Sequence, residues 1–137
     1  MSAIFLILAV VTVSFGIYVR TAPSPAQTWH QLPAVIATKD LPGGAMRVVD
    51  PANRMDLQYI HEIALQGMNT KQLSGSIEED MITYISRSKF WGFPDYTTVR
   101  LQGGRLELYG RLRFGRSDFG VNASRIDHWL RLLSERG

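Results

Sequence analysis

The stretch Tyr96-Thr-Thr-Val-Arg-Leu-Gln-Gly-Gly-Arg-Leu-Glu-Leu-Tyr-Gly-Arg-Leu-Arg-Phe114 decides the fold. Apolar and polar residues alternate on both sides of Gly103-Gly104, and a glycine pair supplies the positive φ angles that a two-residue hairpin turn needs. The turn therefore predicts that the segments 96–102 and 105–114 pair as antiparallel strands in one fixed register. In that register the core side carries Val99 opposite Leu108 and Leu101 opposite Leu106, and the other side carries Tyr96 opposite Arg111 and Arg100 opposite Glu107.

Patterns on either side of this hairpin complete the predicted domain. A helix is expected at about 54–66, with Asn53 as its cap, and a last helix at about 120–134, with Asp118 as its cap. Further strands are expected at 34–38, 46–49 and 80–88. The predicted fold class is α+β: an N-terminal single transmembrane helix, then a small antiparallel sheet covered on one face by two helices.

The N-terminus has the composition of a membrane anchor. Residues 2–19 are uncharged and mostly apolar, about the minimum that crosses a ~30 Å hydrocarbon layer as a helix, and Tyr18 and Arg20 are typical interfacial residues. A cleaved signal peptide is the alternative, because Ser24-Pro25-Ala26 loosely resembles a cleavage site, but no Lys or Arg precedes the apolar run. We interpret the segment as a retained anchor.

The chain is therefore predicted to have three parts. Residues 1–20 form the transmembrane anchor, residues 21–33 form an extended tether with three prolines, and residues 34–137 form an extracytoplasmic α+β domain. The chain has no cysteine, which excludes disulfides and thiolate metal sites. The net charge of +3 is uneven: residues 20–80 hold 5 Lys and Arg against 7 Asp and Glu, whereas the residues from 81 onward hold 10 against 5. The basic half points to an anionic contact or to a solvated face.

Three motifs in that basic half resemble a known family. They are Gly92-Phe93-Pro94-Asp95-Tyr96, then Val99-Arg100, and the block 115–126, Gly-Arg-Ser-Asp-Phe-Gly-Val-Asn-Ala-Ser-Arg-Ile. With them the stretch 90–133 resembles an uncharacterised bacterial and algal family, catalogued as domain of unknown function 1499. The residues 18–24 and Trp29-His30 resemble its membrane-tethered proteobacterial members.

The resemblance implies an extracytoplasmic, periplasmic domain on a single anchor in the bacterial inner membrane, and it supplies no reaction. The chain departs from the family at Tyr96, where relatives have a second Asp. It departs again at Tyr109-Gly110-Arg111-Leu112-Arg113, where relatives have a strand richer in serine. Any role of those acids and hydroxyls in relatives is therefore not transferred to this chain.

The motif turns supply a first candidate site, because they flank neighbouring strands. Its members are polar: Asp95, Arg116, Asp118, Asn122 and Arg125. As a site, this cluster would bind an anion or sugar hydroxyls. We favour a structural interpretation, in which Asp118 caps the last helix, an arginine pairs with a carboxylate and Asn122 satisfies loop backbone.

The outward side of the hairpin supplies a second candidate, a basic and aromatic binding face. Its members are Arg100, Arg111, Arg113, Tyr96, Tyr109 and Trp91. Beyond a membrane this pattern favours an anionic lipid or an acidic protein as partner, and no nucleic acid is expected. A solvated sheet face is the alternative. Of the adjacent Phe90 and Trp91, one is expected to meet a partner or the membrane interface.

Three functions follow from these features. The leading hypothesis is a non-catalytic accessory or assembly subunit that docks on a larger inner-membrane protein complex. The second is a binding module for an anionic lipid or small anionic ligand on the Arg/Tyr face. The third is a hydrolase-like enzyme that uses Asp95 and Asp118. No metal or cofactor is expected, because the three histidines lack ligand spacing and no phosphate loop is present.

Overall fold

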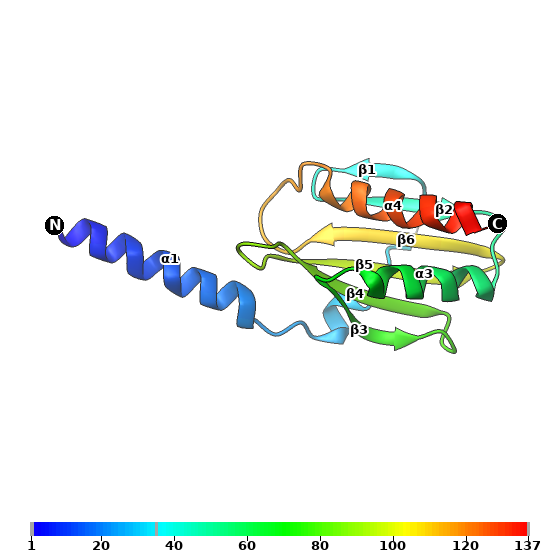
Figure 1. The fold of residues 1–137 in the computed structure, drawn as a ribbon, viewed down its shortest axis with the longest axis horizontal. Coiled ribbons are helices and arrows are strands. Elements are labelled where there is room, and N and C mark those ends of the chain that lie inside the picture. Colours follow the sequence, from blue (N-terminus) through cyan, green and yellow to red (C-terminus); the bar gives the residue numbers. More distant parts are fainter. Residues whose placement is uncertain (1, 35, 137) are drawn as a thin grey trace.

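An apolar helix projects from a two-layer domain in a computed structural model of the protein, which describes residues 2–34 and 36–136. The helix α1 (Ala3–Thr21) leads to a six-stranded antiparallel sheet, and two longer helices lie side by side on one face of that sheet (Figure 1). The predicted α+β fold is thus confirmed.

The elements follow one another in a simple order. After α1 come α2 (Ala26–Trp29), β1 (Lys39–Leu41), β2 (Gly44–Val49), α3 (Arg54–Gln66), β3 (Thr70–Ser76), β4 (Met81–Arg87), β5 (Pro94–Gln102), β6 (Arg105–Leu112) and α4 (Val121–Arg136). The strand order across the sheet is β1-β2-β6-β5-β4-β3. The predicted hairpin is therefore the centre of the sheet, and α3 and α4 are the covering helices.

The register of the central hairpin is the one that its glycine turn predicts. Val99 pairs with Leu108, and Tyr96 pairs with Arg111. Both turn glycines have positive φ, 60° at Gly103 and 74° at Gly104. Because side chains alternate along a strand, this register places one set of β5 and β6 residues against the helices and the other set on the opposite face.

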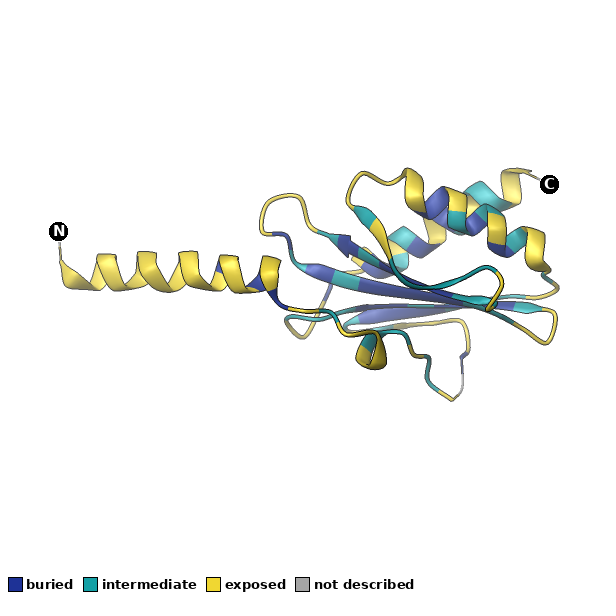
Figure 2. Cartoon of the chain, turned by 90° about the horizontal axis from the view of Figure 1, so that it is seen from below, coloured by how far each residue is buried: buried dark blue, intermediate teal, exposed yellow. Residues whose placement is uncertain are grey.

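The core lies between the helices and the sheet, where Figure 2 shows the buried residues of the central strands. The helix α3 begins with the predicted cap: the Asn53 side chain accepts from the Asp56 backbone at 3.1 Å, and the Asp56 carboxylate accepts from the Asn53 backbone at 2.8 Å. The fully buried core side chains include Leu57, Ile60, Ile82, Tyr84, Val99, Leu106, Leu108 and Ile126. The apolar side chains on one face of each helix and on the inward side of the hairpin thus pack into one core.

The helix α4 lies unusually close to β6 at Gly110. A Cβ atom placed on this glycine would lie 2.9 Å from Cδ1 of Ile126 and 3.0 Å from Oδ1 of Asn122. Both contacts are shorter than ordinary van der Waals separation, so a larger residue would push α4 away from the sheet. Gly110 is therefore required here for close packing.

We expect Gly110→Ala to destabilise the protein by about 1–3 kcal/mol, because it over-packs the contact between α4 and β6. Urea unfolding followed by circular dichroism would measure the loss. Gly67→Ala is the matched control, since Gly67 has φ of −69° and its Cβ would meet only ordinary contacts at 3.4 Å. Equal stability of the two variants would contradict the account of this contact.

Two expectations from the sequence are corrected, and one strand was not predicted. No strand forms at Ala34 or at 36–38, Val35 lies outside the described residues, and the first strand begins at Lys39. The strand β3 was not expected, because its sequence Thr-Lys-Gln-Leu-Ser-Gly-Ser is mostly polar and its pairing with β4 is interrupted by a bulge. Residues 26–29 are helical, so the segment 21–33 is not simply extended.

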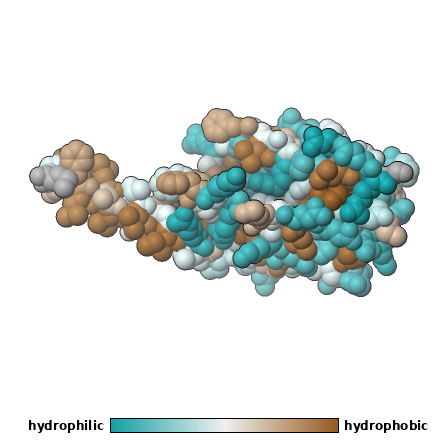
Figure 3. All heavy atoms as spheres, viewed as in Figure 1, coloured by the Kyte–Doolittle hydropathy of each residue, from teal (hydrophilic) through white to brown (hydrophobic). Residues whose placement is uncertain are grey.

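The helix α1 has the length and composition of a membrane span. Among the described residues it is the one helix that is both long and apolar enough to cross a bilayer, and a secretory signal sequence would share these properties. Its surface is apolar in Figure 3, whereas hydrophilic residues dominate the domain. Only Gly16 and Val19 of α1 are buried, and both lie near the domain.

Candidate functional site

The last turns of α1 are held against one end of the domain. The Arg20 guanidinium donates a hydrogen bond to the carbonyl of Phe90 in the β4–β5 loop. In return, Nη1 of Arg87 donates to the Val19 carbonyl at 3.2 Å and to the Gly92 carbonyl at 2.9 Å. The helix α1 and the β4–β5 loop are therefore joined by polar contacts on both sides.

Aromatic side chains surround this junction. Neighbouring rings lie with their centroids 5.2–6.4 Å apart, distances at which edge-to-face and tilted pairs attract one another. We call this set the aromatic collar: Phe15, Tyr18, Phe90, Trp91, Phe93 and Phe114. Phe90 remains 75% exposed and Trp91 41% exposed, so the collar has a large apolar surface of its own.

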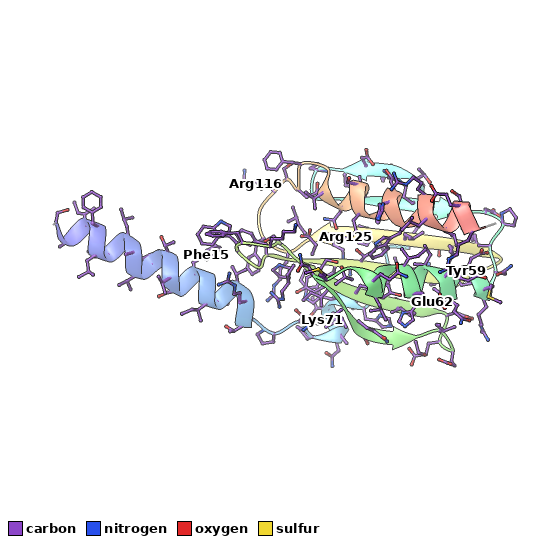
Figure 4. The ribbon with its side chains drawn as sticks, in the orientation of Figure 1. Phe15, Tyr59, Glu62, Lys71, Arg116 and Arg125 are labelled. Carbon is purple, nitrogen blue, oxygen red and sulfur yellow. The ribbon has the colours of Figure 1, made fainter. Side chains whose placement is uncertain are left out.

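A pocket of about 450 Å³ opens beside the collar, and we call it the junction pocket. Most of its wall is apolar: Phe15, Phe93, Leu112, Phe114, Phe119 and Val121. The remaining lining consists of Gly115 and four polar residues, Ser88, Asp95, Ser117 and Asp118. Figure 4 places Phe15 at the domain end of α1, and Arg116 on the loop between β6 and α4. The pocket is thus built jointly by the helix α1 and the domain.

Part of the pocket's polar wall is a hydrogen-bonded chain. Nη2 of Arg125 lies 3.5 Å from the Asp95 carboxylate, and its Nη1 donates to Asn122 at 2.8 Å. The Asn122 side chain donates to Asp118 at 2.9 Å, and Asp118 also accepts from the backbone of Gly120 and Asn122. The structure brings together four of the five residues of the predicted polar cluster. The fifth, Arg116, is exposed on the loop.

The two carboxylates of this chain have opposite electrostatic environments. Burial raises the pKa of Asp95 above its ordinary value, and the nearby Arg125 only partly offsets this effect. Burial also acts to raise the pKa of Asp118, but hydrogen bonds from Asn122 and Gly120 outweigh it and lower that pKa. Asp118 thus stabilises the start of α4 as an ionised cap, and Asp95 is paired with Arg125. This arrangement favours the structural interpretation of both residues.

We expect Asp95→Asn to gain stability relative to the native protein as the pH rises. A carboxyl whose pKa is raised by folding is favoured in its protonated form, so its contribution to stability is lost as the pH rises through its folded pKa. Unfolding free energies between about pH 4 and pH 7 would measure the difference. A difference that does not change with pH would contradict the effect of burial.

The second predicted site, the Arg/Tyr face, is not open. Residues 22–33, which we call the strap, lie across the sheet face opposite the helices. The Trp29 ring stacks on Tyr96 with centroids 3.9 Å apart and planes inclined by 14°. Tyr96 is fully buried and Arg111 is 9% exposed. The expectation of an exposed face is therefore wrong at these two positions.

Polar contacts hold the strap to the strands. The Ser24 hydroxyl lies 2.6 Å from the Tyr96 hydroxyl, and Nδ1 of His30 lies 2.8 Å from the Thr83 hydroxyl. Nη1 of Arg113 donates to the Pro23 carbonyl at 2.8 Å. The composition of this segment gave little sign of such contacts, although Trp29 is an unusual residue for a solvated tether.

The other predicted binding residues are distributed between two places. Arg100 pairs with Glu107 at 2.7 Å, which confirms the cross-strand ion pair that the register predicts. Tyr109 is partly exposed and lies against Arg111. Trp91 is remote from them, in the collar. Sequence reasoning missed the junction pocket, although the aromatic residues of the two loops beside α1 were a usable signal.

Comparisons with known proteins place the chain in a family. No curated protein and no solved structure matches the chain. A family model described as "Protein of unknown function (DUF1499)" matches residues 19–133. The match begins at the end of α1 and includes the strap, the whole sheet and most of α4. It confirms the resemblance that the three motifs carry, and the chain belongs to this family of proteins of unknown function.

Proposed function

We propose that the protein is a single-pass membrane protein whose domain rests on the bilayer surface and binds a membrane lipid in the junction pocket, without catalysing a reaction. The observation that carries the proposal is the make-up of the pocket wall. One of its apolar side chains, Phe15, belongs to the helix that is long enough to span the bilayer, and the others belong to the domain. A bilayer acyl chain beside α1 is the apolar molecule nearest to such a pocket.

The depth of Phe15 supports this location. At 1.5 Å per residue, Phe15 lies roughly 9 Å from the end of α1 at Thr21, so it would sit in the outer part of the hydrocarbon layer, beside lipid acyl chains, if α1 spans the bilayer. Trp and Tyr are enriched at the membrane interface just outside that depth, and Tyr18 and Trp91 belong to the collar. The exposed Phe90 and Phe119, 75% and 93% accessible, would then contact lipid rather than water.

The charges at the two ends of the domain support an anionic lipid. The loops beside α1, residues 88–93 and 113–120, carry Lys89, Arg113 and Arg116, against the single buried acid Asp118. The loops at the opposite end carry the acids Asp50, Glu78, Glu79 and Asp80, of which Asp80 pairs with Arg54. A domain with this uneven distribution of charge is attracted to an anionic membrane surface through its basic end.

Contacts between α1 and the domain support a retained anchor over a cleaved signal peptide. Loss of α1 would remove Phe15 and Tyr18 from the collar and would expose more of Phe93 and Phe114 to water. It would also free Arg87 from the Val19 carbonyl. We therefore place the domain next to the membrane, and from the family resemblance we propose the periplasmic side of the bacterial inner membrane.

Native mass spectrometry of the intact protein, released from the membrane in mild detergent, tests the proposal. We expect a population that carries about one phospholipid per chain and loses it only at high collision energy. A chain free of lipid would contradict lipid binding. The accessory-subunit hypothesis predicts a different result, a second protein at stoichiometric mass, and that outcome without lipid would replace our proposal.

A further inference from the structure

Arg111 is a buried cation whose charge is not neutralised by a carboxylate. It is 9% exposed, and none of the ion pairs among residues 2–34 and 36–136 involves it. The neighbouring arginines of the same sheet face differ, because Arg100 and Arg105 both pair with Glu107. Buried charges in proteins are normally paired, so this guanidinium is an exception that requires an explanation.

The contacts of the guanidinium are all neutral. Nη1 donates to the Thr98 hydroxyl at 2.8 Å and to the Tyr109 carbonyl at 3.2 Å. Nη2 donates to the Trp29 carbonyl and lies 3.5 Å from the Gln31 carbonyl. The Tyr109 and Trp29 rings lie 4.8 and 5.7 Å from the charge centre. These dipoles and ring faces stabilise the cation in part. Burial still lowers the pKa of Arg111 to about 10.

A second pocket lies beside this uncompensated charge. It has a volume of about 310 Å³ and is lined by residues of the strap and of β6: Thr28, Trp29, Gln31, Leu32, Pro33, Tyr109 and Arg111. The side chains of Thr28, Gln31 and Tyr109 can donate hydrogen bonds, and none of the lining residues is acidic. The pocket therefore offers one cation and several neutral donors, which is the complement of an oxyanion.

We propose that this pocket, which we call the anion pocket, binds a small molecule through a carboxylate or phosphate group, with Arg111 as the counter-charge. An oxyanion would add the charged partner that the buried guanidinium lacks, and such charge-assisted hydrogen bonds are stronger than those to neutral acceptors. The indole of Trp29 and the phenol of Tyr109 form walls that suit an apolar or planar group attached to the oxyanion. This site is independent of the junction pocket, with which it shares no lining residue.

The site would also link ligand binding to the position of the strap. Five of its seven lining residues belong to the strap, and the strap is held to Arg111 by backbone carbonyls. A ligand that bridges Gln31 and Arg111 would therefore stabilise the closed strap. Since the strap begins directly after α1, occupancy of the anion pocket would be communicated to the segment at the membrane surface.

Titration of the intact protein with inorganic phosphate and with phenyl phosphate, at constant ionic strength, tests the proposal. The readout is the indole N–H resonance of Trp29 in nuclear magnetic resonance spectra, identified by its loss in Trp29→Phe. We expect a saturable shift with either probe, and about tenfold weaker binding in Arg111→Met, which keeps the apolar stem but removes the charge. An equal response in Arg111→Met would overturn the proposal. The absence of a shift with both phosphate probes and with the vesicles described below would also overturn it.

A second variant and a titration with lipid vesicles complete the experiment. Because Arg111→Met removes buried contacts, Gln31→Leu, at an exposed position, is a second variant and is expected to weaken binding without unfolding the protein. Vesicles of phosphatidylglycerol replace free phosphate in a parallel titration. A response to vesicles alone would assign the oxyanion to a lipid headgroup, and a response to free phosphate would assign it to a soluble ligand. Absence of both would refute the site, whatever is found at the junction pocket.

Discussion

Val121→Trp is expected to reduce the lipid that co-purifies with the protein by about tenfold. Val121 lines the junction pocket at the first residue of α4 and is 49% exposed, so an indole at this position fills the pocket instead of entering the core. The substitution leaves the collar and the Asp118 cap in place. Lipid bound per chain, measured by native mass spectrometry in mild detergent, is the readout.

Gln102→Trp is the matched control for this experiment. It adds the same side chain at an exposed position at the far end of β5, next to the hairpin turn and away from α1. It is expected to retain the native amount of lipid and thereby to exclude a general effect of a surface indole. If Val121→Trp binds as much lipid as the control does, the junction pocket is not the lipid site.

Trp29→Ala is expected to destabilise the protein by about 3 kcal/mol. This value is at the lower end of the range for truncating a packed tryptophan, because the Trp29 side chain is only partly buried. The substitution removes the stack on Tyr96 and the ring that lies over Arg111 and Arg113. The strap then loses its largest contact with the sheet. Urea unfolding of the intact protein would measure the loss, and faster proteolysis within residues 22–33 would accompany it.

Trp91→Ala is the comparison for that measurement. Trp91 is also an aromatic residue outside the main core, but it is 41% exposed and belongs to the collar. We expect it to change the unfolding free energy by less than about 1 kcal/mol in detergent. Equal effects of the two substitutions on the free energy of unfolding would show that the Trp29 contact of the strap stabilises the protein no more than a surface residue does.

The sequence predicts the centre of this fold well because its local signals agree. The glycine turn, the alternation of residues and the pairing of Arg100 with Glu107 all point to one register, and the structure has it. The capped helix at Arg54–Gln66 is predicted for the same reason. The strand β3 is missed because its residues are mostly polar, so neither β-propensity nor alternation marks it.

The candidate sites are predicted only where neighbouring turns determine them. Asp95, Asp118, Asn122 and Arg125 meet because β5 begins and the neighbouring strand β6 ends at the same end of the sheet. The junction pocket depends on where α1 docks, which no local pattern specifies. The sequence also does not predict that the strap covers the sheet. The burial of Tyr96 and Arg111 arises from contacts between residues that are about 70 to 80 positions apart.

Photocrosslinking tests the central claim most directly. Intact protein in membranes is labelled with a phospholipid that carries a photoactivatable diazirine along its acyl chain, and the adducts are mapped by mass spectrometry. Our account predicts adducts on domain residues of the junction pocket, Phe93, Leu112 and Phe114, in addition to those on α1, and their loss in Val121→Trp. Adducts confined to α1, with none on these residues of the native domain, would contradict it.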